Sequence, residues 1–159
     1  ISLPVSTIGS PPSSRMATSK ETRVRVEGLS KIMASVLPAS GFGAFVEDVH
    51  LAGIGALLVD PATRSGEIAS MYTLTRFLGE GIGGHLIAHA RRLAREQGLS
   101  VLYACTTSPR VVAFFERNGL CVVPQEAVPV TKWRGYDVAR RPSVICLRED
   151  LTATSREPG

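Results

Sequence analysis

Apolar positions along the first half of the chain predict one helix followed by three strands. From Val26 to Leu37 apolar residues recur three or four positions apart, as on one face of a helix, until Pro38 ends the pattern. Three apolar segments follow, each bounded by turn residues and rich in residues that favour a pleated surface. We therefore expect strands at Phe42–Glu47, Ala52–Asp60 and Glu67–Leu74.

In the second half the pattern predicts helices that alternate with strands. A glycine-rich segment, Gly79–Gly84, precedes a helix that runs to about Gln97, where Gly98 stops it. The next segment, Leu99–Thr107, is almost continuously apolar, which is typical of a strand buried on both faces. A second helix follows from Ser108-Pro109 to Asn118-Gly119, and the last strands are expected at Leu120–Val123 and Ser143–Leu147. This order predicts a mixed α/β domain.

Composition narrows the class of protein. The chain has 159 residues, of which 44% are hydrophobic, and this is enough for one domain with its own core. Its longest uncharged apolar stretch, Ala52–Val59, is far shorter than the roughly 20 residues of a membrane span, so we expect no membrane partner. Three cysteines without C-x-x-C spacing indicate a reducing compartment, hence a cytoplasmic protein without a zinc site. His85 and His89 have metal-ligand spacing but lack a third ligand, so no metal is expected.

The two ends of the chain differ from its middle. The first twenty residues hold six serines and three prolines and no acidic residue. We therefore expect residues 1–22 to form a disordered arm, residues 23–151 to form the domain and residues 152–159 to form a flexible tail. A transit peptide and an interdomain linker share the composition of this arm, so targeting to an organelle stays open.

The positive charge of the chain is concentrated near its end. Between Thr131 and Arg148 five basic residues stand against one acidic residue, an excess equal to the net charge of +4 of the whole chain. A small anionic ligand, nucleic acid and a solvated basic face would each account for it. Nucleic acid is the least favoured of these, because only Trp133 and Tyr136 accompany the charges as stacking groups.

The segment Gly79–Gly84 has the pattern of a phosphate-binding loop. A strand that enters a glycine-dense turn and then a helix exposes backbone N–H groups at the positive end of the helix. The lysine of a P-loop is missing, and so is the acidic residue that should follow the dinucleotide fingerprint G-x-G-x-x-G by about 20 positions. The pyrophosphate of coenzyme A remains as a ligand, beside the alternative of a turn that binds nothing.

Three segments together resemble the GNAT acyl-CoA-dependent N-acetyltransferases. They are Glu67-Ile-Ala-Ser-Met-Tyr72, Gly79-Glu-Gly-Ile-Gly-Gly-His-Leu-Ile87 and Phe114-Phe-Glu-Arg-Asn-Gly-Leu120. The resemblance implies the GNAT fold, with a mixed central sheet flanked by helices, and acetyl-CoA as cosubstrate. In this superfamily the loop has the form R/Q-x-x-G-x-G/A, and Leu78 stands where arginine or glutamine is usual.

A narrower resemblance points to the acetyltransferase domain of N-acetylglutamate synthases. It rests on Ala104–Thr107, on Phe114–Gly119 and on the segment from Val128 to Val144, although Pro142 occupies the position of a serine in that family. It implies acetylation of the α-amine of an amino acid, glutamate first, in arginine biosynthesis, and either a homo-oligomer or a fusion to another domain of that pathway. Acetylation of another amine and a non-catalytic acyl-CoA-binding module are the alternatives.

The resemblance also implies roles for single residues. Glu67 would accept the proton of the amine through water, and the backbone amide of Tyr72 or Thr73 would stabilise the oxyanion. Phe115 stands where many members have a tyrosine that protonates the leaving thiolate, so no dedicated general acid is expected for that step. The residues expected to bind the cofactor are Met71, Tyr72, Thr73, Leu78, Gly79, Glu80, Gly81, Ile82, Gly83, Gly84, Thr106 and Phe114. Those expected to bind the substrate are Arg140, Arg141, Lys132 and Thr107, of which the three basic residues would be the cations for its carboxylates.

Overall fold

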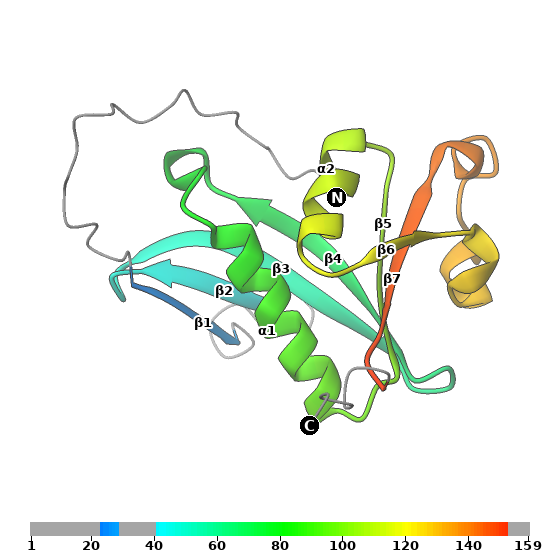
Figure 1. Cartoon of the computed structure of the whole chain (residues 1–159), viewed down its shortest axis with the longest axis horizontal. Coiled ribbons are helices and arrows are strands. Elements are labelled where there is room, and N and C mark those ends of the chain that lie inside the picture. Colours follow the sequence, from blue (N-terminus) through cyan, green and yellow to red (C-terminus); the bar gives the residue numbers. More distant parts are fainter. Residues whose placement is uncertain (1–22, 29–40, 153–159) are drawn as a thin grey trace.

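The computed structural model describes residues 23–28 and 41–152, and their strands form one seven-stranded mixed sheet (Figure 1). The strands are β1 (Val24–Gly28), β2 (Gly41–Val46), β3 (His50–Asp60), β4 (Ser65–Thr73), β5 (Val101–Thr106), β6 (Cys121–Val123) and β7 (Ile145–Asp150), in the spatial order β1-β2-β3-β4-β5-β7-β6. The helices are α1 (Ile82–Glu96) and α2 (Pro109–Arg117), with short 3₁₀ turns η1 (Thr75–Phe77), η2 (Gln125–Ala127), η3 (Val130–Trp133) and η4 (Arg141–Ser143). The predicted mixed α/β domain is thereby confirmed.

The prediction of a helix from Val26 is wrong for residues 26–28, the part of it that the structure describes. Val24–Gly28 is a strand, and Val26 pairs with Ala44 of the antiparallel neighbour β2. Val24 and Val26 alternate with charged residues and pack against the core, so a period of two outweighs the helical spacing. The rest of the predicted helix, the arm at residues 1–22 and tail residues 153–159 lie outside the described residues. A strand therefore precedes Phe42, where we expected at most a helix.

Strands β4 and β5 are parallel neighbours along only a short stretch. Their pairing covers Ser65–Glu67 and Val101–Tyr103, after which β5 continues its pairing with β7 (Figure 1). A bulge on β4 opposite Gly55 places Ser70 in the left-handed region, with a φ of 54°, and bends the strand. Among the described strands none pairs with residues 68–73 on the side toward β5, so that backbone is free to pair with another group.

Two hydrophobic clusters lie on the two faces of β5. Leu102 and Ala104 join the main cluster with α1, whose apolar stripe includes Leu86, Ile87 and Ala90. The other face of β5 packs with Trp133 in a second cluster. The continuous apolar run of β5 is thus explained by burial on both faces, as predicted. The second cluster also anchors the basic segment after β6 to the sheet.

Candidate active site

The glycine-rich segment forms an uncapped helix start. Gly79 and Gly81 have φ values of 84° and 75°, in the left-handed region that favours glycine, and Gly81 is the N-cap of α1. No side chain caps this end, so the amides of the first turn, from Ile82 to Gly84, have no side-chain acceptor. A Cβ added to Gly81 would meet no atom within 4 Å. The loop therefore offers open space and several N–H donors, which suit an anion such as a pyrophosphate.

Two of the predicted cradle glycines also have a packing role that the sequence did not reveal. A Cβ on Gly83 would lie 2.6 Å from the Cζ atom of Phe114 on α2. A Cβ on Gly84 would lie 3.3 Å from Oδ1 of Asn118, whose Nδ2 donates to the carbonyl of Phe114. The glycines thus allow α1 and α2 to approach closely at the loop. The predicted cofactor residue Phe114 borders the cradle by packing on Gly83.

The other predicted cofactor residues present backbone more than side chain. Met71 and Thr73 are buried in β4, whereas the side chain of Tyr72 between them is exposed. In the loop Leu78 is half-buried and Glu80 is exposed. The predicted role of β4 in cofactor binding depends on its backbone N–H and C=O groups. Beyond Glu67 these groups lie on an edge that β5 does not pair with. The contacts of these β4 and loop residues with a cofactor stay a prediction.

A cavity of about 330 Å³ lies beside the basic segment, at the end of β5 and at the part of β4 where its pairing with β5 stops. It brings together Glu67, Thr106, Thr107, Lys132 and Arg140, five residues that the sequence assigns to catalysis or binding. Its remaining walls are Leu58, Ala69, Cys105, Tyr136 and Val144. The sequence indicates Tyr136 as a stacking group of the basic segment and does not assign it to the site, because its segment has no periodicity that would place it beside Glu67.

Glu67 and Lys132 form an ion pair inside this cavity. Lys132 Nζ lies 2.5 Å from Glu67 Oε2, and the two side chains are 18% and 10% exposed. Burial by itself lowers the pKa of Lys132, but the hydrogen bond and the charge of Glu67 outweigh burial and raise it overall. The ammonium of Lys132 is therefore paired with the carboxylate of Glu67 and is not a free cation.

The two predicted carboxylate-binding arginines have different surroundings. Arg140 lines the cavity and is exposed, and no described residue hydrogen-bonds its guanidinium. Arg141 does not line the cavity: its guanidinium lies 4.3 Å from the ring centre of Trp133, and its Nε donates to Gln125 Oε1 at 3.1 Å. The structure thus leaves Arg140 as the cation available to an acceptor, while Arg141 supports the segment that carries it.

The neighbouring polar groups of the cavity do not compete with Glu67 as a base. Burial raises the pKa of Tyr103, the register partner of Glu67, so its phenol stays protonated at neutral pH. Cys105 donates a hydrogen bond to Cys146 across the strand pair β5–β7, with 3.5 Å between the sulfurs, and this bond and burial raise the pKa of Cys105. Thr106 Oγ1 accepts a hydrogen bond from the amide of Ser108, so its hydroxyl is already bonded to the backbone that leads into α2.

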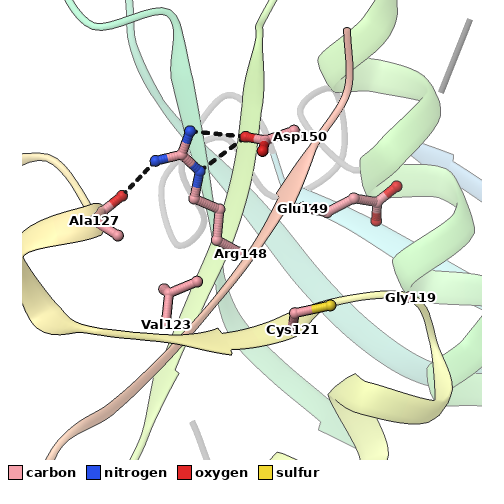
Figure 2. A pocket seen from close by; sticks show the side chains of 7 residues that line it. All are labelled: Gly119, Cys121, Val123, Ala127, Arg148, Glu149 and Asp150. Carbon is pink, nitrogen blue, oxygen red and sulfur yellow. Dashed lines mark hydrogen bonds and ion pairs between the residues drawn. The ribbon is translucent and has the colours of Figure 1, made fainter. Parts of the chain in front are cut away.

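A second cavity, of about 430 Å³, lies at the β6 edge of the sheet (Figure 2). Its charged groups are already paired. The guanidinium of Arg148 donates to Asp150 and to the carbonyl of Ala127, and Glu149 accepts from Arg91. The first cavity, with an exposed guanidinium and a buried carboxylate, is therefore the better candidate for an active site.

The potential metal ligands within residues 23–28 and 41–152 are not clustered. No group of three or more of them occurs there. His89 packs against the ring of Phe42, with 4.9 Å between the ring centres, and its Nδ1 lies 3.0 Å from the guanidinium of Arg92. None of the helices in that part of the chain has the length and apolar character of a membrane span.

Comparisons with known proteins agree with this arrangement. Residues 16–120 match the family model described as Acetyltransferase (GNAT) family. The amino-acid acetyltransferase of Vibrio cholerae is 28% identical over 102 residues, which are 64% of this chain and 22% of that protein. The chain thus spans about a fifth of the length of this curated relative.

Solved structures share the fold. N-acetylglutamate synthase from Neisseria gonorrhoeae, in complex with coenzyme A and N-acetyl-glutamate, superposes with a TM-score of 0.66 at 20% identity, over 83% of this chain and 36% of that one. The IAA acetyltransferase from Bacillus cereus matches with a TM-score of 0.58 at 19% identity, over 80% of this chain and 99% of that one. With its mixed sheet, its uncapped glycine loop and a family match over most of its length, the chain belongs to the GNAT acetyltransferase family.

Proposed function

We propose that this chain transfers the acetyl group of acetyl-CoA to the α-amine of an amino acid, with L-glutamate as the first candidate. The observation that carries the proposal is the cavity between β4 and β5. It combines one buried carboxylate, Glu67, with one exposed guanidinium, Arg140. An amino acid needs both: a base for its ammonium and a cation for its carboxylates. The relatives from Vibrio cholerae and Neisseria gonorrhoeae support the choice of an amino acid.

Acetyl-CoA supplies the activated acetyl thioester, and the residues present fit it. The free N–H groups of the first turn of α1 suit the pyrophosphate, and Gly81 leaves the approach open. The unpaired edge of β4 offers main-chain groups to the amide-containing arm of the cosubstrate, as an added strand would use them. The amide of Tyr72 or Thr73 is the proposed donor to the developing oxyanion.

The amine has to lose a proton before it attacks the thioester. Glu67 Oε2 is bonded to Lys132, and among the described residues none hydrogen-bonds Oε1, which leaves Oε1 to take the proton, directly or through water. Attack is then direct, in a ternary complex without a covalent enzyme intermediate. The leaving thiol has a pKa near that of cysteine, about 8.5, so a dedicated acid is not required. Phe115, fully buried in the core, supplies none.

A screen of single amino acids tests this function. Coenzyme A release is followed with acetyl-CoA and each amino acid, and turnover with glutamate is the expected result. Arg140→Ala should raise the KM for the acceptor by roughly 10- to 100-fold, because a charged hydrogen bond of about 1.5–3 kcal/mol is lost. Arg134→Ala, another exposed arginine of the same segment that lies outside the cavity, is the matched control.

Two other results would change the proposal. Tight binding of acetyl-CoA without turnover on any amine would identify a non-catalytic acyl-CoA-binding module. Turnover only with other small amines or with proteins would keep the acetyltransferase and replace the acceptor. The roles in arginine biosynthesis and the cytoplasmic location belong to the same proposal, as does a homo-oligomer or a fusion to another domain of the pathway.

A further inference from the structure

We propose that Lys132 is a positioning residue for Glu67 and does not bind the carboxylate of the acceptor. The proposal rests on the proposed function, because it assigns the work of Lys132 to the base of that reaction. Its observation is the ion pair between the buried side chain of Glu67 and the half-buried side chain of Lys132, two residues that lie 65 positions apart in the sequence. The sequence placed Lys132 with the substrate-binding arginines, and the structure places its ammonium on the base.

The pair leaves one carboxylate oxygen available. Lys132 holds Oε2 of Glu67 at 2.5 Å, and both residues line the acceptor cavity. A carboxylate fixed through one oxygen presents the other in a defined direction. A proton acceptor needs this, because proton transfer requires hydrogen-bond distance and alignment. Lys132 thus restricts the rotation of the Glu67 side chain.

Lys132 is itself held in place by its element. Thr131 Oγ1 donates to Asp60 Oδ2 at 2.9 Å and ties η3 to the end of β3. On the other side of Lys132, Trp133 is buried in the second hydrophobic cluster. The ammonium also lies 5.6 Å from the centre of the Tyr136 ring, a distance that allows a cation–π contact. These contacts hold the ammonium at Glu67 before any acceptor binds.

The charges around Glu67 give the ion pair a second effect. The titratable groups around it are Tyr103 and Cys105 from β5, Cys146 from β7, Lys132 from η3, and Tyr136 and Arg140 from the segment that follows. Among these, Lys132 is the cation in direct contact. A buried carboxylate without a counter-charge takes up a proton at higher pH than a paired one. Lys132 therefore supplies the counter-charge of the Glu67 carboxylate in this cavity.

The alternative role of Lys132 has a cost that Arg140 does not have. Lys132 keeps N–H groups beyond its bond to Glu67, but an acceptor carboxylate placed on them would bring a second negative charge beside the buried carboxylate of Glu67, whose charge already neutralises the ammonium. Arg140 carries no such bond and is exposed at the same cavity. The two cations therefore have separate roles: Arg140 binds the carboxylate of the acceptor, and Lys132 orients Glu67, the base.

Steady-state kinetics separates the two roles. For Lys132→Met we expect kcat to fall at least about tenfold at neutral pH, with the KM for the amino acid changed less than about threefold. The acidic limb of the kcat/KM profile should move to higher pH by about 1–3 units, and Lys132→Arg should restore most of the rate. A tenfold or larger rise in KM, with kcat and the acidic limb unchanged, would overturn the proposal and make Lys132 a substrate ligand.

A measurement without acceptor keeps this proposal separate from the proposed function. In protein labelled with carboxyl-¹³C glutamate, Glu67→Gln identifies the Glu67 signal, and its titration midpoint is compared between the wild type and Lys132→Met. We expect a midpoint about 1–3 pH units higher in the variant. That shift supports the role of Lys132 even if no amino acid is turned over. Equal midpoints refute it even if glutamate is acetylated. Lys132→Gln, which also removes the charge, replaces Lys132→Met if the latter does not fold, and Lys132→Arg, which keeps the charge, is the control expected to retain the wild-type midpoint.

Discussion

The close approach of α1 and α2 at the glycine loop makes a sharp prediction about two adjacent glycines. In Gly83→Ala the new Cβ would lie 2.6 and 2.8 Å from two carbons of the Phe114 ring. The ring cannot move freely, because it is half-buried and stacks edge-on against Phe115 with 5.5 Å between the ring centres. In Gly84→Ala the nearest atom would be Oδ1 of Asn118, at 3.3 Å, which can yield by a few tenths of an ångström.

The pair of variants isolates the cost of the contact. Both substitutions lie in the first turn of α1, so both gain the same helix propensity, about 1 kcal/mol. Only Gly83→Ala adds overpacking, which costs about 1–3 kcal/mol. Gly84→Ala should therefore be more stable than Gly83→Ala by about 1–3 kcal/mol. Chemical unfolding followed by circular dichroism measures this difference in the free energy of unfolding. In thermal unfolding, each kcal/mol corresponds to a difference of about 2–4 °C in Tm.

A compensating variant tests the cause. Phe114→Leu in the Gly83→Ala background shortens the side chain opposite the new methyl group and should recover part of the loss, which a double-mutant cycle detects as coupling. Equal stabilities of Gly83→Ala and Gly84→Ala would refute the reasoning. So would a cycle without coupling, because the ring of Phe114 would then not rest on Gly83.

Three further predictions concern other parts of the molecule. Arg91→Met should lower the free energy of unfolding, measured in urea, by about 3 kcal/mol, because it leaves the carboxylate of Glu149 without its cation. Glu149 accepts hydrogen bonds from Arg91 through both oxygens, and its side chain is only 11% exposed. A loss below about 1 kcal/mol would contradict this. Burial, with the charge of Arg92, lowers the pKa of His89 below its usual 6.5, so the contribution of His89 to stability is full above that pH and falls as the pH drops below it. His89→Leu should therefore flatten the pH dependence of thermal unfolding between pH 7 and 5. An unchanged slope would exclude His89 as the source of that dependence. In the native protein Ellman's reagent should modify the exposed Cys121 rapidly and the two buried cysteines only after unfolding, and three equally fast thiols would contradict the packing.

Much of the fold follows from local patterns in the sequence. β5 is apolar throughout because both of its faces are covered, and Gly98 ends the helical pattern with a φ of 72°. These elements were predictable because hydrophobic period and turn chemistry act over a few residues. The strand at Val24–Gly28 was not, since its partner β2 decides between a period of two and a helical spacing. Pairing across the sheet is information that no local window contains.

The site divides in the same way. The sequence by itself determined which residue types were present: a glycine loop before a helix, a glutamate on the central strand, and a basic segment near the end of the chain. Only the tertiary structure decided which partners these residues contact. In the structure Lys132 bonds to Glu67, the guanidinium of Arg141 packs on the ring of Trp133, and Arg140 lines the cavity. The reason is physical: the partner of a charge depends on distance and burial in space, and neighbours along the chain do not specify these.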